Sequence, residues 1–167
     1  TRLTLDELLE ANTEKYTSVY ADRGAAGAPT RVSDGRIRQC EYKGEKVDKV
    51  KVYIPVFPGT NCDYDTQRAF ERAGAEVEMS VFKNLTGEDV IASIAEMVEH
   101  ISRCHIMALS GGFSAGDEPD GSGKFIANVL NNKDVADAIH ALLDRGGLML
   151  GICNGFQALV KSGLLPY

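Results

Sequence analysis

The chain has 167 residues, of which 44% are hydrophobic and 25% are charged, so it can bury one substantial core and has no room for two large ones. Its formal net charge of −6 comes with no dense run of Lys or Arg, which argues against nucleic acid and against an anionic membrane as partners. The longest apolar runs, at 106–109 and 148–152, are far shorter than the roughly 20 residues that span a bilayer.

The first 49 residues differ in composition from the rest. A short amphipathic helix is predicted by four closely spaced leucines, Leu3, Leu5, Leu8 and Leu9. A stretch rich in Gly, Ala and Pro follows at 24–35, and the chain begins with neither an initiator Met nor a signal-peptide pattern. We therefore expect residues 1–49 to be a linker with a short helix inside a longer protein, and we expect that helix to need a partner surface.

Strands and helices alternate regularly from residue 50. The apolar run 50–57 is β-branched enough for a buried parallel strand, and a Pro-Gly break ends it. A helix is predicted over 63–73, ended by Gly74, and the alternation from Val77 to Val81 predicts the second strand. These elements form one strand-helix-strand unit.

The same alternation continues to the end of the chain. Thr86 and Asp89 are placed to cap a helix, and the residues after it predict a strand over 104–109. The remaining predicted elements are a Gly-rich loop at 110–123, helices near 125–130 and 135–143, a strand over 148–152 and a helix over 154–161. The pattern predicts an α/β fold of three layers, with helices on both faces of a mainly parallel sheet and binding residues at the carboxyl ends of the strands.

A strand-to-helix turn near the end of the chain carries the strongest chemical signal. Residues 151–155 read GICNG, which matches the GxSxG nucleophile elbow with Cys153 in the Ser position. A helix beginning at Asn154 would stabilise a thiolate, and the Asn154 N–H would face a developing oxyanion. A buried structural thiol is the alternative, because Cys is also an ordinary small core residue.

The Gly-rich loop that leaves the third predicted strand is a second candidate element. Its glycines, in SGGFSAGD at 110–117, would let backbone N–H groups approach a ligand and complete an oxyanion hole with Asn154. A flexible surface turn is the alternative. Cys62, in PGTNCD, is a competing nucleophile that lacks the glycine frame, so we favour a packed thiol whose loop helps to line the same crevice.

The remaining cysteines and the histidines offer no second site. Cys40 lies in the predicted linker and Cys104 in an apolar strand, and the wide spacing of the four cysteines favours reduced thiols in the cytoplasm over a disulfide framework. No metal site is expected, since the histidines show no zinc-ligand spacing to the cysteines. A nucleophilic Cys needs a base, and His100, His105 and His140 are each better explained as structural.

Three separated motifs resemble the glutaminase domain of the phosphoribosylformylglycinamidine synthase family, a class I glutamine amidotransferase with a flavodoxin-like fold. They occur in the family's order as IPVFPGTNCDYDT, LSGGFSAGDEPDGSGKFIANVLNN and GICNGFQ. The resemblance covers about 50–167, as the N-terminal part of that domain. The opening LTLDELLEANTEKY resembles the segment that joins the synthetase to the glutaminase in large single-chain members.

The resemblance implies a role for each of several residues. Cys153 would be the nucleophile, N–H groups around Gly112 and of Asn154 would form the oxyanion hole, and glutamine would contact the residues Gly111, Phe113 and Gln157. Cys153 would attack the glutamine side-chain amide, and ammonia would pass to the synthetase domain of the same polypeptide. There, ATP and magnesium would activate formylglycinamide ribonucleotide for conversion to the amidine in purine biosynthesis, with no cofactor in this chain itself.

One departure from the family bears on activity. Family members carry a catalytic His and Glu in a later segment, and no such pair appears before Tyr167. The piece by itself is therefore expected to be inactive. Two alternatives stay open, namely another Cys-elbow hydrolase of the same superfamily and an inert fragment that serves only as a folding or interface module.

Overall fold

The computed structural model describes residues 3–19, 46–113 and 123–165, which belong to two compact units, Thr1–Glu41 and Tyr42–Tyr167. The first contains helix α1 (Leu5–Val19), which begins with a reciprocal cap. The Glu7 N–H donates to Thr4 Oγ1 at 3.2 Å, and the Thr4 N–H donates to the Glu7 carboxylate at 2.7 Å. Its four predicted leucines are at least half exposed. The predicted linker at 24–35 lies outside the described residues.

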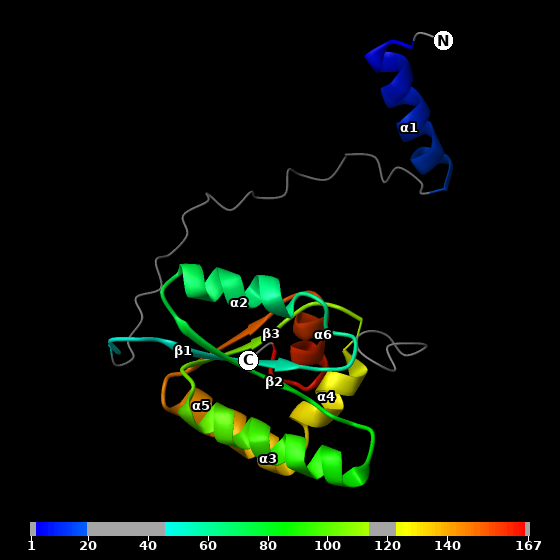
Figure 1. The fold of residues 1–167 in the computed structure, drawn as a ribbon. Helices are drawn as coiled ribbons and strands as arrows, with labels where there is room; N and C mark the ends of the chain where they lie inside the picture. The colour runs from blue at the N-terminus through cyan, green and yellow to red at the C-terminus, as the bar shows by residue number, and fades with distance from the viewer. Residues whose placement is uncertain (1–2, 20–45, 114–122, 166–167) are drawn as a thin grey trace. The chain divides into compact units, whose positions relative to one another are not determined.

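The second unit is an α/β fold (Figure 1), as predicted. Its described strands are β1 (Lys51–Val56), β2 (Glu76–Val81), β3 (Ile106–Leu109) and β4 (Leu148–Gly151). Its described helices are α2 (Asp63–Arg72), α3 (Gly87–Arg103), α4 (Lys124–Leu130), α5 (Lys133–Asp144) and α6 (Asn154–Lys161). All strand pairs are parallel, in the order β2-β1-β3-β4.

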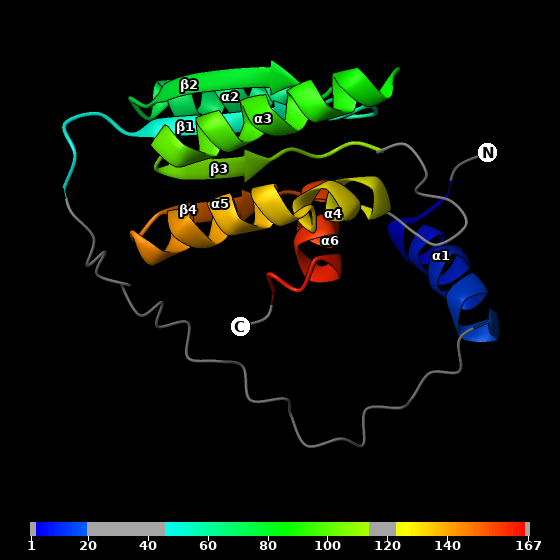
Figure 2. The same cartoon turned by 90° about the horizontal axis from the view of Figure 1, so that it is seen from below.

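Two apolar clusters divide the unit into three layers. On one face of the sheet, Val52, Ile54 and Ala108 pack with Phe70 of α2. On the other, Tyr53 and Met107 belong to a larger cluster with residues of α3, α4, α5 and α6. Figure 2 shows α3 and α5 side by side along this face. Helices on both faces explain why the central strands β1 and β3 are near-continuous apolar runs.

The strand order places three loops together. Because β1 and β4 flank β3, the loops that leave the carboxyl ends of these strands are neighbours at one edge of the sheet. The chain passes from β1 outward to β2 and then returns to β3 on the other side of β1, which makes the β1–β3 gap a topological switch point. Ligand sites of open α/β sheets lie at such points.

Helix α3 confirms the predicted cap and corrects one boundary. The Asp89 N–H donates to Thr86 Oγ1 and the Thr86 N–H donates to the Asp89 carboxylate, both at 3.1 Å. Cys104 was predicted to begin the third strand but is the C-cap residue of α3, and β3 begins at Ile106. The cause is that the Cys104 N–H still donates to the His100 carbonyl, so the last helical hydrogen bond of α3 ends at Cys104 and the strand begins after it.

Candidate active site

Cys153 lies at a sharp turn between β4 and α6. It is the N-cap residue of α6 and has φ 50° and ψ −106°, and no other non-Gly residue in the described part of the chain has a positive φ. Such a conformation costs on the order of 1–3 kcal/mol for an L-residue and persists only when its surroundings hold it. The Cys153 side chain is exposed, so the strain presents a thiol at the carboxyl edge of the sheet.

Two glycines of the motif are required by close backbone packing. A Cβ on Gly151 would lie 2.7 Å from Leu159 Cδ1 and 2.8 Å from the Phe156 backbone. A Cβ on Gly155 would lie 2.3 Å from the Leu109 carbonyl oxygen. The elbow can therefore form only where α6 approaches β3 and β4 without side chains between them, which gives the glycines a steric reason.

The loop after β3 is paired with the loop after β1. The Phe113 N–H donates to the Gly59 carbonyl at 2.9 Å, and the Asn61 N–H donates to the Gly111 carbonyl at 3.3 Å, which forms an antiparallel bridge between Thr60 and Gly112. Gly112 has φ 142°, and a Cβ there would lie 2.3 Å from the Gly59 oxygen. Only glycine fits this position.

This pairing orients the Gly112 N–H. In a trans peptide, the carbonyl and the following N–H point in opposite directions. Because the Gly111 carbonyl points at Asn61, on the β1 side, the Gly112 N–H points to the β4 side, where the elbow lies. In the same way, the Cys153 carbonyl accepts from the Gln157 N–H at 3.0 Å, so the Asn154 N–H points out from the N-terminus of α6.

Gly111 is the point at which two cysteines meet. A methyl group placed there would lie 3.4 Å from Cys153 Cβ and 3.7 Å from Cys62 Sγ. Cys62 is the exposed N-cap residue of α2. Its backbone is held by Thr66, whose hydroxyl donates to the Cys62 carbonyl at 2.6 Å and accepts from buried Ser110 at 3.1 Å.

The other residues predicted to form the site differ in how exposed they are. Phe113 is 79% exposed and follows the paired segment directly, and Gln157 is exposed one turn into α6. Asn154 is buried. The rest of the Gly-rich loop, 114–122, lies outside the described residues. The structure thus brings Gly111 beside Cys153 and aims the Gly112 N–H at that side.

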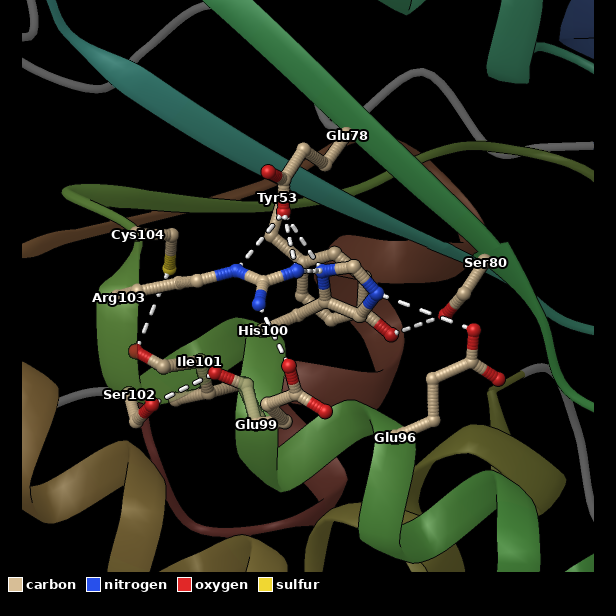
Figure 3. A network of polar contacts seen from close by, with 10 residues as sticks. All are labelled: Tyr53, Glu78, Ser80, Glu96, Glu99, His100, Ile101, Ser102, Arg103 and Cys104. Carbon is tan, nitrogen blue, oxygen red and sulfur yellow. Dashed lines mark hydrogen bonds and ion pairs between the residues drawn. The ribbon is translucent and has the colours of Figure 1, made fainter.

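The three histidines have other surroundings. His105 precedes β3, where its Nδ1 accepts from the Lys51 N–H at 2.9 Å at the opposite end of the strands from the elbow. His140 is exposed on α5. His100 stacks on the buried Tyr53 ring at 4.7 Å and contacts Glu78 at 2.7 Å, in the polar network of Figure 3. No contact among the described residues places any of them beside Cys153.

The Glu78 network leads to a prediction about pH. The pKa of Glu78 lies below its ordinary 4.5, mainly through the hydrogen bond with His100; burial opposes this shift, and Arg103 adds to it. A lowered folded-state pKa stabilises the fold above the unfolded pKa, and that stabilisation is lost as the pH falls through the folded pKa. Glu78→Gln should therefore lower the free energy of unfolding at neutral pH. The loss should be no more than about 1 kcal/mol, because the side chain is a third exposed and solvent screens its interactions.

The measurement is the urea midpoint of both proteins as a function of pH. The difference between wild type and Glu78→Gln should shrink below about pH 4, where the unfolded carboxyl becomes protonated. A difference that stays constant into acid would show that the variant acts by repacking and not by loss of charge.

One hollow in the described part of the chain is remote from the elbow. It has a volume of about 750 Å³ and lies between α3 and α5, with Ile91, Val98 and Ala141 among its lining residues. A nucleophile is needed for acyl chemistry, and the exposed thiols lie at the carboxyl edge of the sheet. We therefore place the candidate active site at that edge and not in the hollow between α3 and α5.

Sequence reasoning missed the residues that hold the site in shape. Asn61 and Thr66 were given no role, although the first fixes the Gly111 peptide and the second joins Cys62 to Ser110. The signal was present, since polar residues directly after a parallel strand often lie at a binding crevice. Among the described residues, no helix is long and apolar enough to cross a membrane, and no group of three or more His, Cys, Asp or Glu could hold a metal ion.

Known proteins resemble the second unit. Residues 49–167 match the family described as the CobB/CobQ-like glutamine amidotransferase domain. The chain is 42% identical over 120 residues to the phosphoribosylformylglycinamidine synthase subunit PurQ of Dehalococcoides mccartyi, which covers 72% of this chain and 43% of that protein. It is 41% identical over 117 residues to the subunit of the same name from Sulfurimonas denitrificans, covering 70% and 44%.

A solved structure agrees with the sequence matches. The structure of PurLQS from Thermotoga maritima contains a chain similar to this one with a TM-score of 0.50 and 30% identity, over 71% of this chain and 46% of that chain. The chain spans less than half the length of these relatives.

Proposed function

Since the chain belongs to the CobB/CobQ-like glutamine amidotransferase domain family, we propose that it is the glutaminase part of a phosphoribosylformylglycinamidine synthase. The names of its relatives support this, because they are subunits of that synthase. The observation that carries the proposal is the strained, exposed Cys153 at a strand-to-helix turn, beside the glycine loop that leaves β3. Strain is expected where a nucleophile is held for reaction.

The reaction proposed for Cys153 is acyl transfer. Its sulfur attacks the side-chain amide carbon of glutamine, ammonia leaves, and water hydrolyses the resulting thioester to glutamate. A base must take the thiol proton and pass it to the leaving ammonia, and His commonly has this role. That base is proposed to come from outside residues 1–167, because each described His has other surroundings.

Two backbone donors are proposed to stabilise the oxyanion. When the sulfur attacks, negative charge develops on the amide oxygen, and N–H groups fixed in advance stabilise it without reorganisation. The Gly112 N–H suits this role because its peptide is held by Asn61 and points to the elbow side. The Asn154 N–H suits it because it lies at the positive end of α6. Around these two donors, glutamine is proposed to contact Gly111, Phe113 and Gln157.

The ammonia is proposed to be used in a synthetase part on the same polypeptide. Support comes from residues 1–48, which precede the family match and contain a capped helix in a compact unit of its own. In this proposal, ATP and magnesium act in the synthetase part, where formylglycinamide ribonucleotide becomes the amidine. No residue of this chain is assigned to that step.

Labelling with a diazoketone analogue of glutamine tests the glutaminase assignment. Such a compound resembles the substrate and alkylates the thiolate that attacks it, so mass spectrometry of the complete enzyme should find the adduct on the Cys153 peptide. Excess glutamine should protect it, and buried Cys104 serves as the internal control. Failure to label Cys153, or labelling of Cys62 in its place, would indicate a hydrolase for another acyl substrate or a different nucleophile.

A further inference from the structure

Two cysteine side chains border the place where Gly111 has no side chain. Cys62 and Cys153 are the N-cap residues of α2 and α6, and neither side chain forms a capping hydrogen bond. Cys62 Sγ and Cys153 Cβ both lie within 3.7 Å of the point that a Gly111 Cβ would occupy. They are therefore no more than twice that distance apart, and the space between them is open to the width of a methyl group.

We propose that Cys62 and Cys153 are a redox pair that forms a reversible disulfide. Its effect on activity rests on the proposed role of Cys153 as glutaminase nucleophile, whereas its formation does not. While the bond exists, the Cys153 sulfur is not a thiolate and cannot attack glutamine, so the site is inactive. Reduction restores both thiols.

The space beside Gly111 is the place where this bond would form. A disulfide needs Cβ atoms about 3.5–4.5 Å apart, so closure brings Cys62 and Cys153 together across the space beside Gly111, which no side chain of the described residues fills. The backbones around both thiols are fixed on the same edge of the sheet. Cys62 is held by the Thr66 N–H at 3.0 Å and Thr66 hydroxyl at 2.6 Å, and the neighbouring Asn61 is bound to Gly111.

A hydroperoxide is the class of oxidant proposed for the reaction. The Cys153 thiolate attacks one peroxide oxygen, the O–O bond breaks, and sulfenic acid and hydroxide (or alkoxide) form. The Cys62 sulfur then attacks the sulfenic sulfur, and the S–O bond breaks as the S–S bond forms. The departing hydroxide takes the proton of the Cys62 thiol and leaves as water. Two thiols have then lost two electrons, and the peroxide has gained them.

Cys104 is the matched control within the same chain. It is buried, its sulfur contacts the Ile101 carbonyl, and burial raises the pKa of its thiol to about 11. A thiol that stays protonated and covered reacts slowly with peroxide. Cys62 and Cys153 are exposed. Oxidation of Cys62 and Cys153 without oxidation of Cys104 therefore distinguishes a specific redox pair from indiscriminate oxidation of the chain.

Peptide mapping without reduction tests the proposal on the intact, folded protein. After treatment with a small excess of hydrogen peroxide, the Cys62 and Cys153 peptides should be linked, with the loss of two hydrogen atoms, and dithiothreitol should separate them. Cys104→Ser should leave the link unchanged. In Cys62→Ser, the link should be absent and Cys153 should accumulate as irreversible sulfinic or sulfonic acid. A link to Cys40, or a link that forms only in denatured protein, would overturn the proposal.

An activity measurement separates the disulfide from the glutaminase assignment. Oxidation should abolish glutamine-dependent activity in the wild type, and dithiothreitol should restore it, whereas Cys62→Ser should not recover. A linked peptide together with unchanged glutaminase activity would retain the disulfide and reject the nucleophile assignment. If the diazoketone labels Cys153 but the linked peptide never forms, the disulfide is rejected and the nucleophile assignment is retained.

Discussion

Cys153→Ala is expected to abolish glutamine-dependent amidine formation by the complete enzyme while synthesis from added ammonium salts continues. Removal of an enzyme nucleophile typically costs on the order of 10⁴–10⁶ in rate, because binding and the oxyanion donors alone supply only the remainder. The ammonia route bypasses thioester formation, so it needs no sulfur at this position. Initial rates with saturating glutamine and with ammonium salts, measured on the same preparation, give the comparison.

Cys62→Ser is the matched control under reducing conditions. Both cysteines are exposed N-cap residues at the same edge of the sheet, and only Cys153 has the strained backbone of an elbow. Glutamine-dependent activity should therefore survive in Cys62→Ser. Retained activity in Cys153→Ala, with loss in Cys62→Ser, would reverse the assignment. Loss of both the glutamine and the ammonia reactions in Cys153→Ala would point to a structural role for its thiol.

The order of elements could be predicted from sequence because each signal is local. Gly163 marks the end of α6 with φ 79°, and Thr86 with Asp89 marks the start of α3. Apolar runs of the right length identify the strands. These features depend on residues within a few positions of one another, so they can be recognised before any tertiary contact is known.

The shape of the site depends on strand order, which the local signals do not contain. Thr60 and Gly112 become partners only because β1 and β3 are neighbours, and Gly111 lies beside both Cys62 and Cys153 only because β3 lies between β1 and β4. The sequence indicated that these loops would share a crevice, and it could not indicate which peptide bond would be aimed at the elbow. Long-range pairing supplied that information.

The exposure of β4 shows the same limit. Its sequence is as apolar as that of a central strand, yet Leu148 is 50% exposed and Leu150 is 41% exposed. In the described part of the chain, β4 is at the edge of the sheet. Helix α2 packs on the same face of the sheet near β1, and no described helix covers Leu148 and Leu150 on that face. An apolar run predicts a strand, and the position of that strand in the sheet then determines how much of it is buried.

Gly112→Ala is expected to reduce glutamine-dependent activity by on the order of 10²–10³, the usual effect of losing one oxyanion donor. The added Cβ would lie 2.3 Å from the Gly59 oxygen and 2.7 Å from Asn61 Oδ1, and the φ of 142° is strained for any L-residue. The paired loops must separate to relieve the contact. The Gly112 N–H would then lose the orientation that the bond between Asn61 and Gly111 imposes.

Gly87→Ala is the matched control, because it adds the same methyl group at a position with nothing within 4 Å. Its rates should equal those of the wild type. Gly112→Ala should also retain ammonia-dependent synthesis and α/β circular dichroism, since the clash is confined to two surface loops outside the main core. The decisive separation is between kcat and KM for glutamine: a donor that acts on the transition state lowers kcat, whereas a loop that only holds substrate raises KM. A variant with unchanged kcat and raised KM would remove Gly112 from the oxyanion hole and assign its loop to glutamine binding alone.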